Sequence, residues 1–364
     1  MKIKEYLTFD DVLIQPRYSS IKSRLDTDIR TKLSTHISLN IPIISSNMSS
    51  VTESKMSIAM ALEGGVGVLH RFKDPKYIAK EIKIVKDFTF DKNEFPIANT
   101  DSSGKLIVGA SVGIREDFLK SIEIFTKENV DFIVIDVAHA HSLYVINAIK
   151  EIKKEFGSSF DLIVGNIATK EAAKDLASLG IDAIKVGIGP GSVCTTRMVA
   201  GVGVPQLSAI DEVYKALSTT NIPIIADGGI RYPADISKAI AAGANTVMLG
   251  NLLAKTTESA GDIVEVNGTL YKRYAGGSSE TEMRKRFKID KREWSSKIAP
   301  EGVEGLVKIE GSVADILNPL TGGLRSALSY TNSKNISQFH KNVRFIRITS
   351  ASLKENGVHD VIVK

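Results

Sequence analysis

A glycine-rich loop at residues 185–206, KVGIGPGSVCTTRMVAGVGVPQ, carries the only cysteine of the chain, Cys194. We call this segment the cysteine loop. Three glycines and a proline at residues 187–191 disfavour a regular helix or strand and allow backbone N–H groups to approach a ligand closely. Such a loop suits an anion, most simply a phosphate. Three hydroxyl side chains flank the thiol, those of Ser192, Thr195 and Thr196. The positive charge of Arg197 favours a thiolate, so the loop predicts a nucleophile beside a phosphate site.

Each of these features has a simpler explanation when it is taken alone. A single cysteine is most often a small buried hydrophobe, and a glycine-rich loop by itself is a weak signal of binding. Here both features overlap in one loop, with hydroxyls and an arginine beside the thiol. This overlap favours a chemical role for Cys194 over a packing role.

The composition limits the class of protein. A chain of 364 residues with 43% hydrophobic and 24% charged residues is typical of a globular protein, which excludes disordered and fibrous classes. No apolar run is long enough to span a bilayer, and the start, MKIKEYLTFDD, has acidic residues where a signal peptide has an apolar core. One cysteine suits a reducing compartment. The net charge of +5 is spread along the chain, so we expect a soluble, cytoplasmic protein without a membrane or nucleic-acid partner.

Short β-branched apolar runs alternate with amphipathic helical stretches, which predicts βα units and a parallel sheet. Eight runs are strand candidates: residues 41–45, 67–70, 106–110, 132–136, 162–165, 183–187, 223–227 and 246–250. The helices expected between them include residues 118–128, 143–156, 170–179, 209–217 and 234–242. Eight such units close naturally into a (β/α)₈ barrel, an α/β fold in which we expect residues 1–364 to form one domain.

Polar and glycine residues follow the predicted strands repeatedly. The segments concerned are residues 45–50, 70–72, 111–113, 136–142, 165–169, the cysteine loop, 227–231 and 250–251. A barrel carries its site on the loops after the carboxyl ends of its strands. A doubly wound sheet would concentrate such residues at one switch point, so their spread over eight loops favours the barrel.

Two segments interrupt this alternation. Residues 87–104 are polar and aperiodic and predict a surface insertion. Residues 258–322 contain NGTLYKRY, a predicted β-hairpin, and then a charged, glycine-flanked stretch without clear periodicity. That stretch is typical of a mobile lid over a barrel mouth, with a disordered surface excursion as the alternative. We expect helices at 312–317 and 323–329, and short strand-like pieces in the tail.

Only one run approaches a basic nucleic-acid surface, RKRFKIDKR at residues 284–292. It lies within the predicted lid. We interpret it as a segment charged for the phosphates of a mononucleotide and a cofactor, since a nucleic-acid surface requires a clustered basic face.

Longer motifs connect these segments across nearly the whole chain. They are LTFDDVLIQP at 7–16, SSNMSSVTE at 45–53, EGGVGVLH at 63–70, DVAHAHS at 136–142, GN at 165–166, GIGPGSVCTTR at 187–197, IADGGIR at 225–231 and PEGVEG at 300–305. Together they closely resemble the IMP dehydrogenase and GMP reductase family, and the cysteine loop is highly specific to it. The resemblance implies a barrel, usually a homotetramer, that binds a purine 5′-monophosphate (GMP or IMP) and a nicotinamide cofactor (NADPH or NAD).

The resemblance also implies a role for individual residues. Cys194 would attack C2 of the purine and form a covalent thioimidate that hydride transfer forms or collapses. Thr196 and Glu301 resemble the pair that relays protons, and Arg286 stands near the position that activates water. The matching substrate residues are Ser46, Met48, Ser192, Asp227, Gly228, Gly229, Gly250, Asn251, Tyr274, Gly276, Gly277 and Ser278. Among them, the family's phosphate contacts match Ser192, Gly229, Gly250 and Tyr274. Asp227 matches the acid that binds the ribose hydroxyls.

The cofactor side is implied in the same way. Asp136, Ala138 and Asn166 match residues near the nicotinamide ribose or below the active site. A monovalent cation such as K⁺ would bind at Gly189, Gly191 and Cys194. The alternative for all of these residues is ordinary capping and turn chemistry at the end of a barrel.

The two activities of the family share the thiol-bound intermediate and differ in its fate. In the dehydrogenase, hydride leaves IMP for NAD, and an Arg-Tyr pair activates the water that hydrolyses the intermediate to XMP. In the reductase, GMP loses ammonia and NADPH delivers hydride to give IMP, so water must be kept away. This chain has Arg286-Phe287 near the expected pair and lacks the phenol. We therefore favour the reductase, with the dehydrogenase as the alternative and a non-catalytic purine-nucleotide-binding homologue as a more remote one.

Other motifs divide between the two activities. KSR at 22–24, SNM at 46–48, HRF at 70–72 and SSETEM at 278–283 resemble the reductase, and the CBS regulatory pair that dehydrogenases often carry is absent near residues 87–104. MVAGVGVPQ at 198–206, PEGVEG and the tail, from RITSASL at 347–353 through HDV at 359–361, resemble the dehydrogenase. The family's usual Met-Asp-Thr is Met48-Ser49-Ser50 here, and Gly276 stands where a methionine backs the base, which predicts empty volume beside the purine. A non-standard purine is therefore an open alternative.

Overall fold

The computed structural model describes residues 3–115, 117–289, 293, 295 and 297–358. Eight parallel strands close into a barrel in the order of the chain, which confirms the predicted fold. They are β4 (Ile43–Ser45), β5 (Val66–Leu69), β6 (Val108–Val112), β7 (Phe132–Asp136), β8 (Asp161–Ile167), β9 (Ala183–Val186), β10 (Ile224–Asp227) and β11 (Thr246–Leu249). Every strand boundary lies within two residues of its predicted position.

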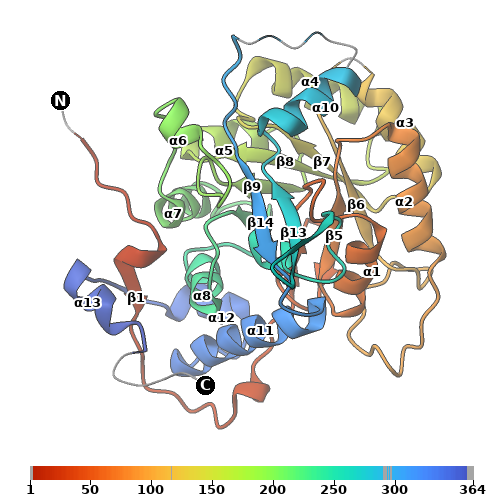
Figure 1. Ribbon diagram of the computed structural model, residues 1–364. Helices are drawn as coiled ribbons and strands as arrows, with labels where there is room; N and C mark the ends of the chain where they lie inside the picture. The colour runs from red at the N-terminus through yellow and green to blue at the C-terminus, as the bar shows by residue number, and fades with distance from the viewer. Residues whose placement is uncertain (1–2, 116, 290–292, 294, 296, 359–364) are drawn as a thin grey trace.

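Helices surround the strands, as Figure 1 shows. Those that follow successive strands are α1 (Ser54–Leu62), α2 (Pro75–Asp87), α3 (Phe118–Lys127), α4 (Leu143–Phe156), α5 (Lys170–Ala177), α7 (Gln206–Ala216) and α8 (Pro233–Ala241). Side-chain caps set where several of them begin. Asp74 accepts from the backbone of α2, Ser142 from that of α4 and Thr169 from that of α5. The loops that precede these caps are therefore fixed at the carboxyl ends of the strands.

The helix that completes the eighth βα unit does not follow β11 directly, because a long insertion comes first, which we call the excursion after β11. The short α9 (Asn251–Ala254) follows β11, and the chain returns as α11 (Val313–Tyr330), which packs against α8 and α1. The sequence predicted two helices in this region, and the structure corrects them to one that continues through Pro319. Its amino end has a capping box, in which Ser312 and Asp315 satisfy each other's backbone N–H groups. The chain then forms α12 (Ile336–Asn342), which also packs against α8.

Two apolar layers hold the barrel together. The larger lies between the strands and the helices. The smaller fills the barrel itself and includes Ile44, Val134, Ile163 and Met248. A hairpin of β2 (Thr31–Lys32) and β3 (Ser38–Leu39) closes the amino ends of the strands, with Leu33 and Leu39 buried in this inner layer. The inner layer is therefore closed at the amino ends of the strands, and a site can open only at their carboxyl ends.

The excursion after β11 contains a three-stranded sheet and a helix. The predicted hairpin is present as β12 (Ile263–Val266) and β13 (Thr269–Ala275), and β14 (Glu304–Lys308) adds to it. The sequence predicted an aperiodic lid after the hairpin. This prediction is wrong in part, because α10 (Glu280–Ile289), between β13 and β14, is helical. Burial of Met283 and Phe287, four residues apart, together with an ion pair from Glu280 to Arg284, explains a helix that polar composition concealed.

The remaining segments are simpler. Residues 88–107 connect α2 to β6 without a helix or a named strand. The tail contains β15 (Phe345–Arg347), which pairs with β1 (Val12–Ile14), but it continues as the helix α13 (Ser350–Glu355) where strand-like pieces were predicted. Thr349 caps that helix. The HDV motif lies outside the described residues. Within the described ranges, no helix combines the length and the apolar character that a membrane crossing requires.

Candidate active site

A cavity of about 340 Å³ opens at the carboxyl ends of the barrel strands. Its lining combines the loops after six of the eight strands, Asn166 near the end of β8 and parts of the excursion after β11. Every residue that the sequence assigned to catalysis, substrate, cofactor or cation lies in this lining. Residues as distant in sequence as Ser46 and Glu301 are therefore brought to one site.

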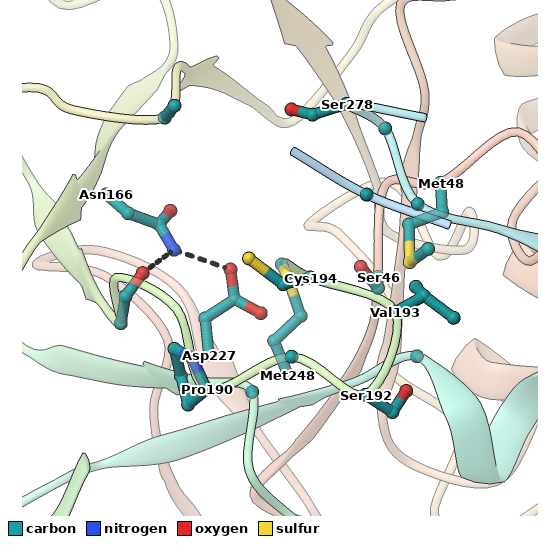
Figure 2. A pocket seen from close by; sticks show the side chains of 18 of the residues that line it. Ser46, Met48, Asn166, Pro190, Ser192, Val193, Cys194, Asp227, Met248 and Ser278 are labelled. Atoms are coloured by element: carbon teal, nitrogen blue, oxygen red, sulfur yellow. Dashed lines mark hydrogen bonds between the residues drawn. The ribbon is translucent and has the colours of Figure 1, made fainter. Parts of the chain in front are cut away.

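The cysteine loop follows β9 and forms the floor of the cavity. Gly187 has a φ of +150°, and a β-carbon there would lie 2.0 Å from the carbonyl oxygen of Asp227, so only glycine fits. A tight turn follows, in which the amide of Cys194 donates to the carbonyl of Gly191 over 3.1 Å. The thiol is partly exposed among the lining residues that Figure 2 shows, and its Sγ lies 3.2 Å from Oγ1 of Thr196. A reactive thiol is thereby held beside a hydroxyl.

Backbone hydrogen bonds attach the excursion to the cysteine loop. The amide of Val303 donates to the carbonyl of Val193, and the amide of Thr195 donates to the carbonyl of Glu301, each over 2.9 Å. Glu301 in turn donates its amide to the carbonyl of Ser278 over 3.1 Å. These bonds bring Glu301 to the cavity that Cys194 lines.

One side of the cavity is suited to an anion. The hydroxyls of Ser192 and Tyr274 lie 3.3 Å apart, and a β-carbon on Gly250 would lie 2.7 Å from the Tyr274 hydroxyl. Burial raises the pKa of Tyr274 to about 12, so its hydroxyl keeps its proton and can donate. Gly228 and Gly229 both have positive φ values, +91° and +83°. Hydroxyls and the backbone of glycine turns therefore converge where the sequence predicted a phosphate.

The opposite side holds a cluster of charges around a buried lysine. Nζ of Lys185 donates to Oδ1 of Asp136 over 3.2 Å, to Oδ2 of Asp227 over 2.6 Å and to the side-chain oxygen of Asn166. The Asn166 amide donates to Asp227 over 3.0 Å and to the carbonyl of Gly187 over 2.7 Å; the dashed lines in Figure 2 mark both bonds. Nε of Arg71 lies 3.7 Å from Oδ2 of Asp136.

These charges hold one another in the ionised state. Burial alone would raise the pKa of Asp136, but the charges of Lys185 and Arg71 outweigh it and lower that pKa. Burial alone would lower the pKa of Lys185, but Asp227 and Asp136 outweigh it and raise that pKa. The cluster therefore keeps both signs of charge at neutral pH.

Sequence reasoning missed Lys185 as a site residue and named Arg71 only as part of a motif. The signal for Lys185 was present, because it is the one charged residue in the apolar strand AIKV. A lysine in a strand buried on both faces must have partners inside the protein.

One expectation at the site was wrong, that for Gly276, and the effect of Arg197 on the thiol stays a prediction. Arg197 does not line the cavity; its guanidinium donates to the carbonyl of Val204, and its side chain occupies the space beside Gly189 and Gly203. It therefore braces the loop and does not stand beside the thiol in the cavity. Gly276 does not leave empty volume, since a β-carbon there would lie 2.9 Å from the carbonyl oxygen of Val193. The cysteine loop already fills that space.

Comparison with known proteins agrees with this geometry. A family model described as the IMP dehydrogenase / GMP reductase domain matches residues 6–359. An inosine-5′-monophosphate dehydrogenase of Borreliella burgdorferi is 45% identical over 98% of both chains. That of Cryptosporidium parvum is 42% identical over 98% of this chain and 96% of its own. The crystal structure of a cysteine-to-alanine variant of Trypanosoma brucei GMP reductase, in complex with guanosine 5′-monophosphate, is similar with a TM-score of 0.93 and 32% identity over 99% of both chains. The chain therefore belongs to the IMP dehydrogenase / GMP reductase family of purine nucleotide oxidoreductases.

Proposed function

We propose that this protein is a GMP reductase, which converts GMP, NADPH and two protons to IMP, NADP⁺ and ammonium. The observation that carries the proposal is the environment of Phe287. Its side chain is 3% exposed and does not line the cavity, whereas its neighbour Arg286 does. Among the described residues of the cavity lining, Tyr274 is the only tyrosine, and its hydroxyl is bonded to Ser192 and Met48. The phenol expected for water activation is therefore missing.

The chemistry follows from the residues around the thiol. Cys194 adds to C2 of the purine, and the proton of its thiol passes to Thr196, whose hydroxyl lies 3.2 Å from Sγ. We infer that Glu301 continues this relay to the amino group, which leaves as ammonia. Bound NADPH would supply hydride to the same carbon, after which the C–S bond breaks and IMP is released.

The cavity lining offers groups for each part of the ligands. The phosphate fits the side formed by Ser192, Tyr274 and the adjacent glycine turns. Asp227 would accept hydrogen bonds from the ribose hydroxyls. The nicotinamide ribose would lie near Asp136 and Ala138, both of which line the cavity. The similarity to a GMP reductase that binds guanosine 5′-monophosphate supports this arrangement.

IMP dehydrogenase is the second candidate, in which IMP, NAD and water give XMP and NADH. Two relatives that are 45% and 42% identical carry that name. Arg286 also lines the cavity, where its guanidinium would have to activate water without help from a phenol. The missing hydroxyl affects the one step that separates the two reactions, so we rank the reductase first.

One experiment separates the candidates. The purified protein is offered GMP with NADPH in one cuvette and IMP with NAD in another, and the absorbance of the reduced nicotinamide is followed. We expect it to fall in the first cuvette and to remain at baseline in the second. A rise in the second cuvette would identify the dehydrogenase. No change in either, with purine monophosphate binding retained, would direct the search to a non-standard purine.

A further inference from the structure

Lys185 lies at the inner edge of the cavity lining, among four neighbouring strands. It belongs to β9 and is 2% exposed, while its three partners come from β7, β8 and β10. An ammonium group has three N–H donors, and here each one has its own acceptor. The lysine is therefore fully used within the site and has no donor left for a ligand.

Its contacts fix the orientation of Asp227. Oδ2 of Asp227 accepts from Lys185 over 2.6 Å and from Asn166 over 3.0 Å. None of the hydrogen bonds found among the described residues reaches Oδ1, and Asp227 lines the cavity. Lys185 and Asn166 thus anchor one carboxylate oxygen, and the other remains an acceptor for a ligand; Figure 2 shows the bond from Asn166 to the anchored oxygen.

The same ammonium group also bonds to Asp136, the residue that we place near the cofactor. Asp136 accepts from Lys185 through Oδ1 and faces Arg71 through Oδ2. Two carboxylates are thus balanced by two cations across four strands and one loop. Room for the lysine is provided by Gly165, since a β-carbon there would lie 2.5 Å from that of Lys185. The site is therefore built around this side chain.

We propose that Lys185 is a positioning residue, which aims Asp227 at the ribose diol of the purine nucleotide and joins it to Asp136 on the cofactor side. This inference rests on the proposed function, because it takes the ligand to be a purine ribonucleotide. Lys185 acts through its neighbours and does not touch the substrate.

The test compares Lys185→Met with Lys86→Met. Lys86 is a matched control because it is 3% exposed and also bridges two carboxylates, at 2.9 Å from Asp101 and 2.6 Å from Asp131, but does not line the cavity. Calorimetry measures the binding of GMP and of 2′,3′-dideoxy-GMP, which lacks the diol. Binding is measured without cofactor, so the result is independent of turnover.

We expect wild-type protein to prefer GMP to the dideoxy nucleotide, and Lys185→Met to lose about 10- to 100-fold in GMP affinity while its affinity for the dideoxy nucleotide changes little. Lys86→Met should keep the full preference. If Lys185→Met does not fold, Lys185→Gln removes the charge with less disturbance and should show the same loss of preference.

An equal loss for both nucleotides, or the same loss in Lys86→Met, would overturn the inference and reduce Lys185 to a stabilising residue. A wild-type protein without preference for the diol would also overturn it. These results are separable from the proposed reaction: a protein that shows the preference but does not turn over GMP with NADPH contradicts only the reaction.

Discussion

Two buried lysines at opposite ends of the barrel use the same ion-pair arrangement for different purposes. Lys185 lines the cavity together with its partners Asp136 and Asp227. Lys86, at the end of α2, pairs with Asp101 and with Asp131 just before β7. Each ammonium group bridges two carboxylates and is almost fully buried. The arrangement alone therefore does not distinguish a binding site from a structural one.

The difference lies in the carboxylate oxygens. At the amino ends of the strands, Asp131 accepts from Lys86 and from the amide of Val108, and the other oxygen of Asp101 accepts from Ser103 and Lys105. Every oxygen there has a partner. At the carboxyl ends, Oδ1 of Asp227 faces a cavity. An acceptor left open within an otherwise satisfied cluster marks the binding end of this barrel.

A second cluster at the amino ends supports this distinction. His36, Asp161 and Asp182 offer ligand atoms within 4.8 Å of one another, a spacing that would fit a metal ion. Yet Asp161 accepts from Ser34 and His36, and Asp182 accepts from Thr35, Lys153 and the amide of Leu162. We interpret this cluster as the attachment of the β2–β3 hairpin to the barrel.

The largest effect expected at the carboxyl end is on chemistry. Cys194→Ala should lower kcat by at least about 10⁴-fold, because it removes the nucleophile. The thiol is partly exposed and not part of the apolar core, so the urea midpoint should stay close to that of wild type. Steady-state kinetics, calorimetry with GMP and urea denaturation measure the three properties. Unchanged turnover would remove the covalent mechanism.

The largest effect expected at the amino end is on stability. Lys86→Met leaves two partly buried carboxylates without their buried cation and should cost about 3–5 kcal/mol in the free energy of unfolding at pH 7, with kcat unchanged. Burial raises the pKa of Asp131 to about 6 even beside Lys86, and loss of that cation raises this pKa further. In the variant this carboxyl therefore already takes up a proton as the pH falls toward 6, and the cost should shrink toward pH 5. Urea denaturation across this pH range measures it.

Lys83→Met is the control for Lys86→Met, since Lys83 pairs with Asp87 over 2.9 Å on the same helix but is 61% exposed. It should leave stability nearly unchanged at every pH. A loss as large as that of Lys86→Met would show that helix α2 itself, and not the buried pair, is the sensitive element.

A smaller effect is expected on the pH dependence of the site. In wild-type protein, Lys185 and Arg71 lower the pKa of Asp136, so Asp136 stays ionised above that pKa and loses its charge only as the pH falls through it. In Lys185→Met only Arg71 and a hydrogen bond from Asn47 still lower the pKa of Asp136 against the effect of burial. The acid limb of kcat/KM for the cofactor should therefore move to higher pH, with about a tenfold loss per pH unit below it. An acid limb at the wild-type position would contradict this coupling.

The smallest effect is expected at the hairpin. His36→Ala removes a partly exposed hydrogen bond of 2.7 Å to Asp161 and should lower the free energy of unfolding by about 1 kcal/mol. Added Zn²⁺ should leave the Tm of wild-type protein unchanged, because the carboxylate oxygens are already used. A Zn²⁺-dependent rise in Tm that His36→Ala abolishes would identify a metal site instead.

The sequence by itself determined the barrel and a set of site residues that all line its cavity, although Lys185 was not among them. Apolar runs such as the one at β7 have a period and length that local sequence records, and the loop of Cys194 combines motif and chemistry in one continuous segment. Polar residues at the ends of parallel strands must also meet at one edge. These features need no knowledge of distant contacts.

Tertiary structure alone decided the helix α10, the continuation of α11 through Pro319 and the partners of Lys185. Phe287 stabilises a helix only because the fold buries it, and the side chain of Arg197 packs beside Gly189 and Gly203, outside the cavity lining. The acceptors of Lys185 lie 49, 19 and 42 residues away in sequence. Charges so far apart in the chain meet only when neighbouring strands close into the barrel, so no local pattern records their contact.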